Sequence, residues 1–179
     1  MTTEPGTRRS GKSLRRAGVV LAAVLAVSGA ASSIGAAPVR AQPNVAGIPT
    51  APGTAGLTPQ LALAYTFAAR DAHTAGVPLW ITSGKRSRAE QQALWRDGIA
   101  QYGSPGAARR WVLPPDESTH VTGEAIDVAP RAGAAWLERN GNRWGLCRVY
   151  DNEWWHFELA TVPGQTCPPR LPDASRRHR

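Results

Sequence analysis

The chain has 179 residues, of which 42% are hydrophobic, enough for one ordinary domain with a buried core. Its formal net charge of +8 comes from the two ends: residues 1–41 hold six Lys/Arg against one acid, and residues 170–179 hold four Arg against one Asp. Residues 42–169 hold 11 basic and 11 acidic side chains, so this part lacks the basic surface of a nucleic-acid-binding domain. We therefore expect no nucleic-acid partner.

The first 41 residues have the pattern of a secretory signal peptide. A basic stretch at residues 8–16 precedes the mostly apolar run at residues 17–31, and Val39-Arg40-Ala41 fits a small-x-small cleavage site. The apolar run is short for a membrane span, which needs about 20 apolar residues. We expect a secreted or cell-envelope protein that meets the membrane only through this signal peptide. An uncleaved anchor is the alternative, and the Sec and twin-arginine export routes both stay open.

The rest of the chain predicts an α+β domain over residues 57–168, with a small antiparallel sheet and flanking helices. A Pro/Gly/Ala-rich linker at residues 42–56 precedes this domain, and a basic, disordered tail at residues 169–179 follows it. The expected elements, in chain order, are a helix over 58–76, a strand over 77–83, a helix over 87–102, a loop over 103–117, a strand over 123–129, a short helix over 132–141 and a hairpin with strands near 148–151 and 154–159.

Local signals mark where the first two helices begin. Thr58-Pro59 is typical of an N-cap followed by proline at the first helical position. Ser87 and Glu90 have the spacing of a capping box, in which each side chain accepts a hydrogen bond from the backbone of the other.

Cys147 and Cys167 are the two cysteines of the chain. Cysteines of an exported protein more often pair than stay free, so we expect a disulfide that closes a loop of about 20 residues. Two separate buried thiols are the alternative. The spacing is not that of a CxxC zinc site.

Asp127 is the first candidate for a functional side chain. The alternation of its strand places it on the face opposite Ile126 and Val128, and aspartate is disfavoured inside strands. His120 lies just before this strand, within reach if the backbone turns at a glycine, and His156 lies in the last expected strand. Two histidines and a carboxylate form a three-ligand zinc set that leaves a fourth position for water.

Glu153, three residues before His156, is the candidate acid–base residue that a hydrolase needs beside its metal. A carboxylate beside metal-bound water acts first as a base and later as an acid. Each residue alone also has an ordinary structural explanation: His120 as a hydrogen-bonded loop residue, His156 as a core histidine, Asp127 as a turn cap, and Glu153 as a solvated hairpin residue. Their combination and spacing favour the metal site.

Arg86 lies where the strand over 77–83 turns into the next helix, a place where side chains often point into a cleft. Its planar guanidinium suits a carboxylate or a developing oxyanion. An exposed surface charge is the alternative.

Three motifs occur in order along the chain: SGKRSRAEQ at residues 83–91, Ser118-x-His120-x-x-Gly123-x-Ala125-x-Asp127, and Glu153-x-Trp155-His156. Together they resemble the zinc D-alanyl-D-alanine carboxypeptidases and dipeptidases of the VanY/VanX type, the LAS-type peptidoglycan metallopeptidases. The match in order and spacing extends over about residues 58–160. The resemblance implies a hedgehog/DD-peptidase-like fold.

The resemblance also implies a role for each matching residue. One zinc ion per chain would be bound by His120, Asp127 and His156. Glu153 would activate water and then protonate the leaving amine, and Arg86 would stabilise the oxyanion or hold the substrate. The substrate site would also be lined by Ser118 and Gln91.

The expected function is removal of the terminal D-alanine from peptidoglycan stem peptides that end in D-Ala-D-Ala, by a monomeric enzyme. One alternative is an endopeptidase of the same fold that cleaves an L-Ala-D-Glu bond or a cross-link. Another is a catalytically silent cell-wall binding module. Such a module could keep the zinc ligands and lose the base, so the presence of Glu153 favours the enzyme.

Overall fold

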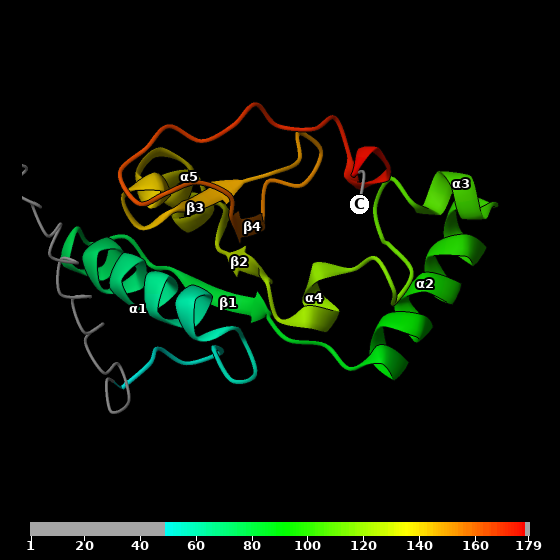
Figure 1. Cartoon of the computed structure of the whole chain (residues 1–179), viewed down its shortest axis with the longest axis horizontal. Coiled ribbons are helices and arrows are strands. Elements are labelled where there is room, and N and C mark those ends of the chain that lie inside the picture. The colour runs from blue at the N-terminus through cyan, green and yellow to red at the C-terminus, as the bar shows by residue number, and fades with distance from the viewer. Residues whose placement is uncertain (1–48, 178–179) are drawn as a thin grey trace, which may run out of the picture. The chain divides into compact units, whose positions relative to one another are not determined.

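The structure, a computed structural model, describes residues 49–177, with a four-stranded antiparallel sheet at the centre (Figure 1). The strands, in their order across the sheet, are β1 (Trp80–Ser83), β2 (Ala125–Ala129), β4 (His156–Leu159) and β3 (Leu146–Arg148). The helices are α1 (Pro59–Thr74), α2 (Arg88–Tyr102), α3 (Pro105–Ala108), α4 (Thr119–Thr122) and α5 (Arg131–Asn140), with 3-10 turns η1 (Gly141–Trp144) and η2 (Ala174–Arg176). The expected α+β class is confirmed.

The expected signal peptide and the first part of the expected linker lie outside the described residues. Residues 49–56, the remainder of that linker, pack against the domain: the Ala51 N–H donates to Thr66 Oγ1 of α1 at 2.9 Å, and Thr54 is buried. Within residues 49–177, no helix has both the length and the apolar character needed to cross a membrane.

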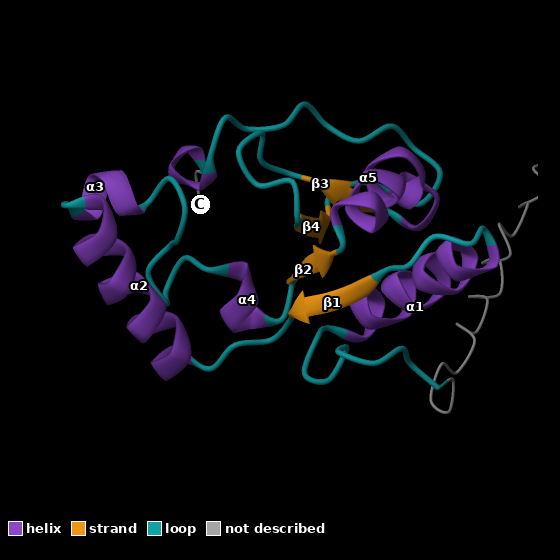
Figure 2. Cartoon of the chain, turned by 180° about the vertical axis from the view of Figure 1, so that it is seen from behind, coloured by secondary structure: helices purple, strands orange, loops and turns teal. Residues whose placement is uncertain are grey.

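The hydrophobic core lies between the sheet and helices α1 and α5. Ile126 and Val128 of β2 are buried in it, on the face expected for them, together with Phe157 of β4. Leu61 and Tyr65 of α1 pack in the same cluster. Figures 1 and 2 show α1 and α5 toward one end of this domain and α2 and α3 toward the other, with α4 between α2 and the sheet.

The two helix starts follow their local signals. α1 begins at Pro59, and the capping box of α2 is present: Ser87 Oγ accepts from the Glu90 N–H at 3.1 Å, and Glu90 Oε2 accepts from the Ser87 N–H at 2.7 Å. Two of the expected elements between residues 103 and 151 need correction. The loop expected over 103–117 contains α3, capped by the Ser104 side chain, and β3 lies earlier than the strand expected near 148–151.

Residues 167–177 form a segment that we call the C-terminal strap. Tyr150 and Leu171 form a parallel β-bridge, flanked by backbone hydrogen bonds of 2.8 and 2.9 Å. Ala174 is buried beside Tyr150. We expected residues 169–179 to be disordered because they are rich in proline and arginine. Residues 169–177 instead follow the domain, where Arg170 pairs with Glu138 and Asp151 and Arg177 pairs with Glu158.

Cys147 of β3 and Cys167, at the start of the strap, form a disulfide with a sequence separation of 20 residues. Replacing both with alanine is expected to lower the free energy of unfolding by about 3 kcal/mol, because the reduced chain regains the loop entropy that the bond removes. Denaturant unfolding without reductant measures this difference. Reduction of the unaltered protein should give the same loss, and equal stability of the three samples would contradict the prediction.

Candidate metal centre

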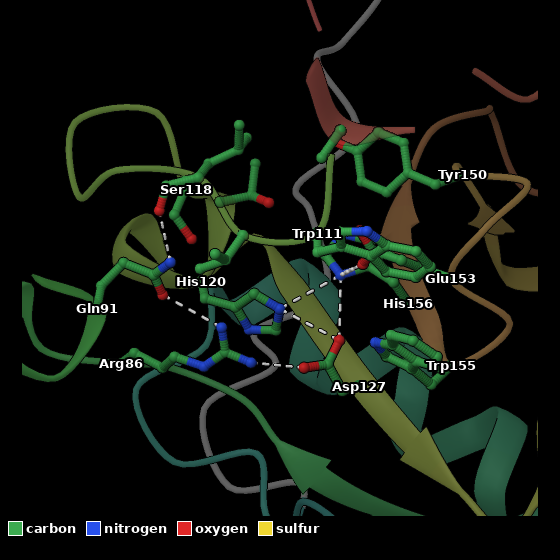
Figure 3. Close-up of a pocket in the computed structure, with 14 residues that line it drawn as sticks. Arg86, Gln91, Trp111, Ser118, His120, Asp127, Tyr150, Glu153, Trp155 and His156 are labelled. Carbon is green, nitrogen blue, oxygen red and sulfur yellow. Dashed lines mark hydrogen bonds and ion pairs between the residues drawn. The ribbon is translucent and has the colours of Figure 1, made fainter. Parts of the chain in front are cut away.

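Three side chains with metal-binding atoms meet beside the sheet: Asp127 from β2, His156 from β4 and His120 from α4 (Figure 3). Asp127 and His156 are direct partners across the β2–β4 ladder. α4 is followed by its C-cap Gly123, whose φ of 78° turns the chain back into β2. A Cβ here would lie 2.6 Å from the Gly56 carbonyl oxygen, so this turn requires glycine.

The three atoms that face one another are Nε2 of His120, Nδ1 of His156 and Oδ1 of Asp127. The two nitrogens are 3.3 Å apart, and Oδ1 lies 3.3 Å from the first and 3.1 Å from the second. Zinc bonds of about 2.0 to 2.1 Å in a tetrahedral arrangement separate the ligand atoms by about 3.3 to 3.4 Å. The spacing therefore fits a tetrahedral zinc ion.

The outer ring nitrogens of the two histidines have partners that select the tautomer needed for metal binding. Nδ1 of His120 lies 2.8 Å from the Gly84 carbonyl oxygen, and Nε2 of His156 lies 2.9 Å from Oε1 of Glu158. Because both partners accept hydrogen bonds, these two nitrogens carry protons and donate them. The inner nitrogens of His120 and His156 can then present lone pairs to a metal, as in other metal-binding histidines.

The Asp127 carboxylate is held from its other side by Arg86. Arg86 Nη2 donates to Oδ2 of Asp127 at 2.5 Å, which leaves Oδ1 facing the histidines. Arg86 is fixed in turn by Ser83 Oγ at 2.7 Å and by Oε1 of Gln91 at 3.2 Å. Ser83 pairs with Asp127 next to an irregularity in the β1–β2 ladder. The sequence predicted that Arg86 stabilises the oxyanion or holds the substrate, and it did not predict this contact with Asp127.

The carboxylates of Asp127 and Glu158 favour a positive charge on the His156 ring that lies between them. Burial acts to raise the pKa of Asp127, but hydrogen bonds from His120 and His156 outweigh it and hold that pKa well below its usual range. Burial likewise acts to lower the pKa of His156, but hydrogen bonds to Asp127 and Glu158 raise it to about 10. A bound metal cation would supply this positive charge in place of the proton.

Glu153 lies beside the three candidate ligands, with Oε2 3.8 Å from Nδ1 of His156. Its side chain is buried, and burial raises the pKa of this carboxyl to about 7. A cation bound at the three ligands would lower this pKa, since an opposite charge favours the ionised form. A carboxyl that ionises near neutral pH can both accept and return a proton.

A pocket opens onto these residues, and its wall includes Arg86, Gln91, Ser118 and Glu153. Gln91 is buried, and its two polar atoms are engaged by Arg86 and by the Leu113 carbonyl, so it holds Arg86 in place. The Ser118 side chain makes no capping hydrogen bond to α4. The pocket wall also includes residues that were not predicted from the sequence as part of the site: Trp111, Val112, Leu113, Thr119, Tyr150 and Ala174.

Glu158, the buried partner of His156, was not predicted from the sequence. Residues two apart in a strand share a face, so a glutamate two positions after His156 was a signal that could have identified it. Its own partner, Arg177, comes from the C-terminal strap, 19 residues further along the chain. No local pattern connects these two residues.

Comparisons with known proteins identify the family and the fold of the chain. The sequence model of the VanY family, described as D-alanyl-D-alanine carboxypeptidase, matches residues 54–160, more than half of the chain. Among curated proteins, no sequence matches.

Three solved structures have a similar fold. One is a Zn(II) complex of a variant of the vancomycin-resistance D,D-pentapeptidase VanY from a VanB-type cassette, with 24% identity over 57% of this chain and 71% of that chain and a TM-score of 0.53. Another is VanYB in complex with D-alanine-D-alanine, with 23% identity over 57% and 70% of the two chains and a TM-score of 0.54. The third, the LdcB LD-carboxypeptidase, has 22% identity over 63% of each chain and a TM-score of 0.52. The fold is that of LAS-type peptidases, and by its sequence match the chain belongs to the VanY family of D-alanyl-D-alanine carboxypeptidases.

Proposed function

We propose that the protein is an exported, zinc-dependent D,D-carboxypeptidase that removes the terminal D-alanine from peptidoglycan stem peptides. The observation that carries this proposal is the convergence of His120 Nε2, His156 Nδ1 and Asp127 Oδ1 at zinc-ligand spacing, with Glu153 beside them on a pocket wall. Membership of the VanY family supports a substrate that ends in D-Ala-D-Ala.

One zinc ion per chain would be held by His120, Asp127 and His156. When bound there, zinc would polarise the scissile carbonyl and lower the pKa of the attacking water toward about 7. Glu153 takes a proton from the attacking water and later returns it to the amine of the leaving D-alanine, so the same carboxyl serves as base and acid.

Arg86 has two tasks in this proposal. Its contact with Oδ2 of Asp127 orients the carboxylate that binds the metal. Three of its five N–H groups are engaged by Ser83, Gln91 and Asp127, and the remaining N–H groups are available to the substrate or to the developing oxyanion. The Ser118 hydroxyl supplies a further polar group on the pocket wall.

The proposed location is outside the cytoplasm, where peptidoglycan lies. The Cys147–Cys167 disulfide supports it, because structural disulfides persist in oxidising compartments. We propose that the protein acts there as a monomer, without a nucleic-acid partner.

Hydrolysis of a synthetic stem pentapeptide ending in D-Ala-D-Ala tests the function. The purified full-length chain with zinc should release D-alanine, and release should stop when a chelator removes the metal and resume when zinc is restored. A tetrapeptide ending in a single D-alanine and a cross-linked muropeptide serve as comparison substrates. Cleavage of either of these, with the pentapeptide left intact, would replace the D,D-carboxypeptidase by an L,D-carboxypeptidase or an endopeptidase.

A further inference from the structure

The partner of His156 outside the candidate metal centre is itself held by the C-terminal strap. Oε1 of Glu158 lies 2.9 Å from Nε2 of His156, and Glu158 is 5% exposed. Arg177 makes a bidentate contact with this carboxylate: Nη1 donates to Oε1 at 2.5 Å and Nη2 donates to Oε2 at 2.6 Å. Thr119 Oγ1 also donates to Oε1, at 3.0 Å. A paired contact of this kind fixes the plane of the carboxylate as well as its position.

Arg177 is kept in place by Tyr150 and by the anchoring of the strap to the domain. Its Nη1 also donates to the Tyr150 hydroxyl at 2.9 Å. Asp173, which is buried, caps the turn η2 that precedes Arg177, and Arg110 Nε donates to its Oδ2 at 3.1 Å. The disulfide of Cys167 ties the start of the strap to β3. The strap therefore presents Arg177 to Glu158 from a segment held at several points.

We propose that the C-terminal strap supports the metal centre. Arg177 holds the Glu158 carboxylate in place, and Glu158 in turn holds the His156 ring in the orientation that binds the metal. This inference rests on the metal role proposed above for His156. Arg177 is a positioning residue, because it touches Glu158 and not the metal ligands. It lies beyond residues 54–160, the range matched by the family, so the family match does not supply it.

The physical reason is the burial of Glu158. A buried carboxylate that loses its charged partner must find another donor or move toward solvent, since an unpaired buried charge is unfavourable. Either change would alter the acceptor that keeps the proton on Nε2 of His156 and steadies its ring. Loss of an outer partner of a metal-binding histidine typically lowers metal affinity by about 10- to 100-fold.

The test compares Arg177→Ala with Arg176→Ala in the full-length chain. Both substitutions remove one positive charge, from adjacent residues at the end of η2, but Arg176→Ala leaves the Glu158 pair in place. Zinc affinity is measured by competition with a chelator, which reads the metal site independently of catalysis. We expect Arg177→Ala to bind zinc about 10- to 100-fold more weakly and Arg176→Ala to bind it as the unaltered chain does. The absorption spectrum of bound cobalt should shift only in Arg177→Ala.

A structural role alone would lower the melting temperature of the metal-free protein and leave the zinc affinity of its folded form unchanged, and this result would overturn the proposal. If Arg177→Ala does not fold, Glu158→Gln is the second variant to test, because it keeps the shape of the side chain and removes the negative charge that Arg177 binds. Weaker zinc binding by Glu158→Gln supports the proposal, and unchanged binding overturns it. If the unaltered chain binds no zinc, the proposed metal site itself is wrong. This outcome differs from a failure of the strap proposal alone, in which the unaltered chain binds zinc and the variants bind it equally well.

Discussion

Glu153→Gln is expected to lower kcat for the pentapeptide by about 10²- to 10⁴-fold, the range that a positioned acid–base group contributes. The amide fills the same space but cannot accept the proton of the attacking water or return it to the leaving amine. The three candidate ligands are untouched, so bound zinc should remain near one per chain. Steady-state rates of D-alanine release, with zinc content determined on the same samples, measure both quantities.

The control for this prediction is Glu124→Gln, which makes the same chemical change at an exposed glutamate just after α4. It should leave both the rate and the zinc content as they are in the unaltered chain. Full activity of Glu153→Gln would mean that another group moves the proton. Loss of zinc along with activity would make Glu153 a metal-binding residue, contrary to the separation of roles proposed here.

Much of the fold could be predicted because its signals are local. The capping box of Ser87 and Glu90 and the proline at the start of α1 each depend on neighbours within one helical turn. The alternation of β2 depends on residues one apart, and it assigned Ile126 to the core face. The grouping of His120, Asp127 and His156 could be anticipated from the motif, and the β2–β4 ladder explains it by making two of them cross-strand partners.

The C-terminal strap could not be predicted in this way. Its composition resembles that of a solvated tail, and its stability depends on partners elsewhere in the chain, such as Glu158 for Arg177 and Glu138 for Arg170. Glu158 lies in β4 and Glu138 in α5, and the disulfide joins the start of the strap to β3, so these pairings depend on the tertiary fold. Arg86 shows a related limit: its place in a cleft was foreseen, but its contact with Asp127 depends on how β1 and β2 pair.

His120→Ala is expected to abolish stoichiometric zinc binding and, with it, hydrolysis of the pentapeptide. The variant leaves His156 and Asp127 as two ligands, and a three-ligand site that loses one member also loses the geometry that selects zinc. The loss of affinity should exceed the roughly 10- to 100-fold that removal of an outer partner costs. Metal content after dialysis against trace zinc, followed by chelator competition, measures it.

The matched control is His73→Ala, which removes a histidine of α1 whose ring contacts the Leu79 carbonyl oxygen at 3.0 Å and lies outside the candidate ligand set. It should keep one zinc per chain even if it lowers the melting temperature. Excess zinc should restore activity to the chelated unaltered chain and to chelated His73→Ala, but not to His120→Ala. Full zinc binding and activity in His120→Ala would remove His120 from the metal centre, and with it the basis of the proposed zinc peptidase.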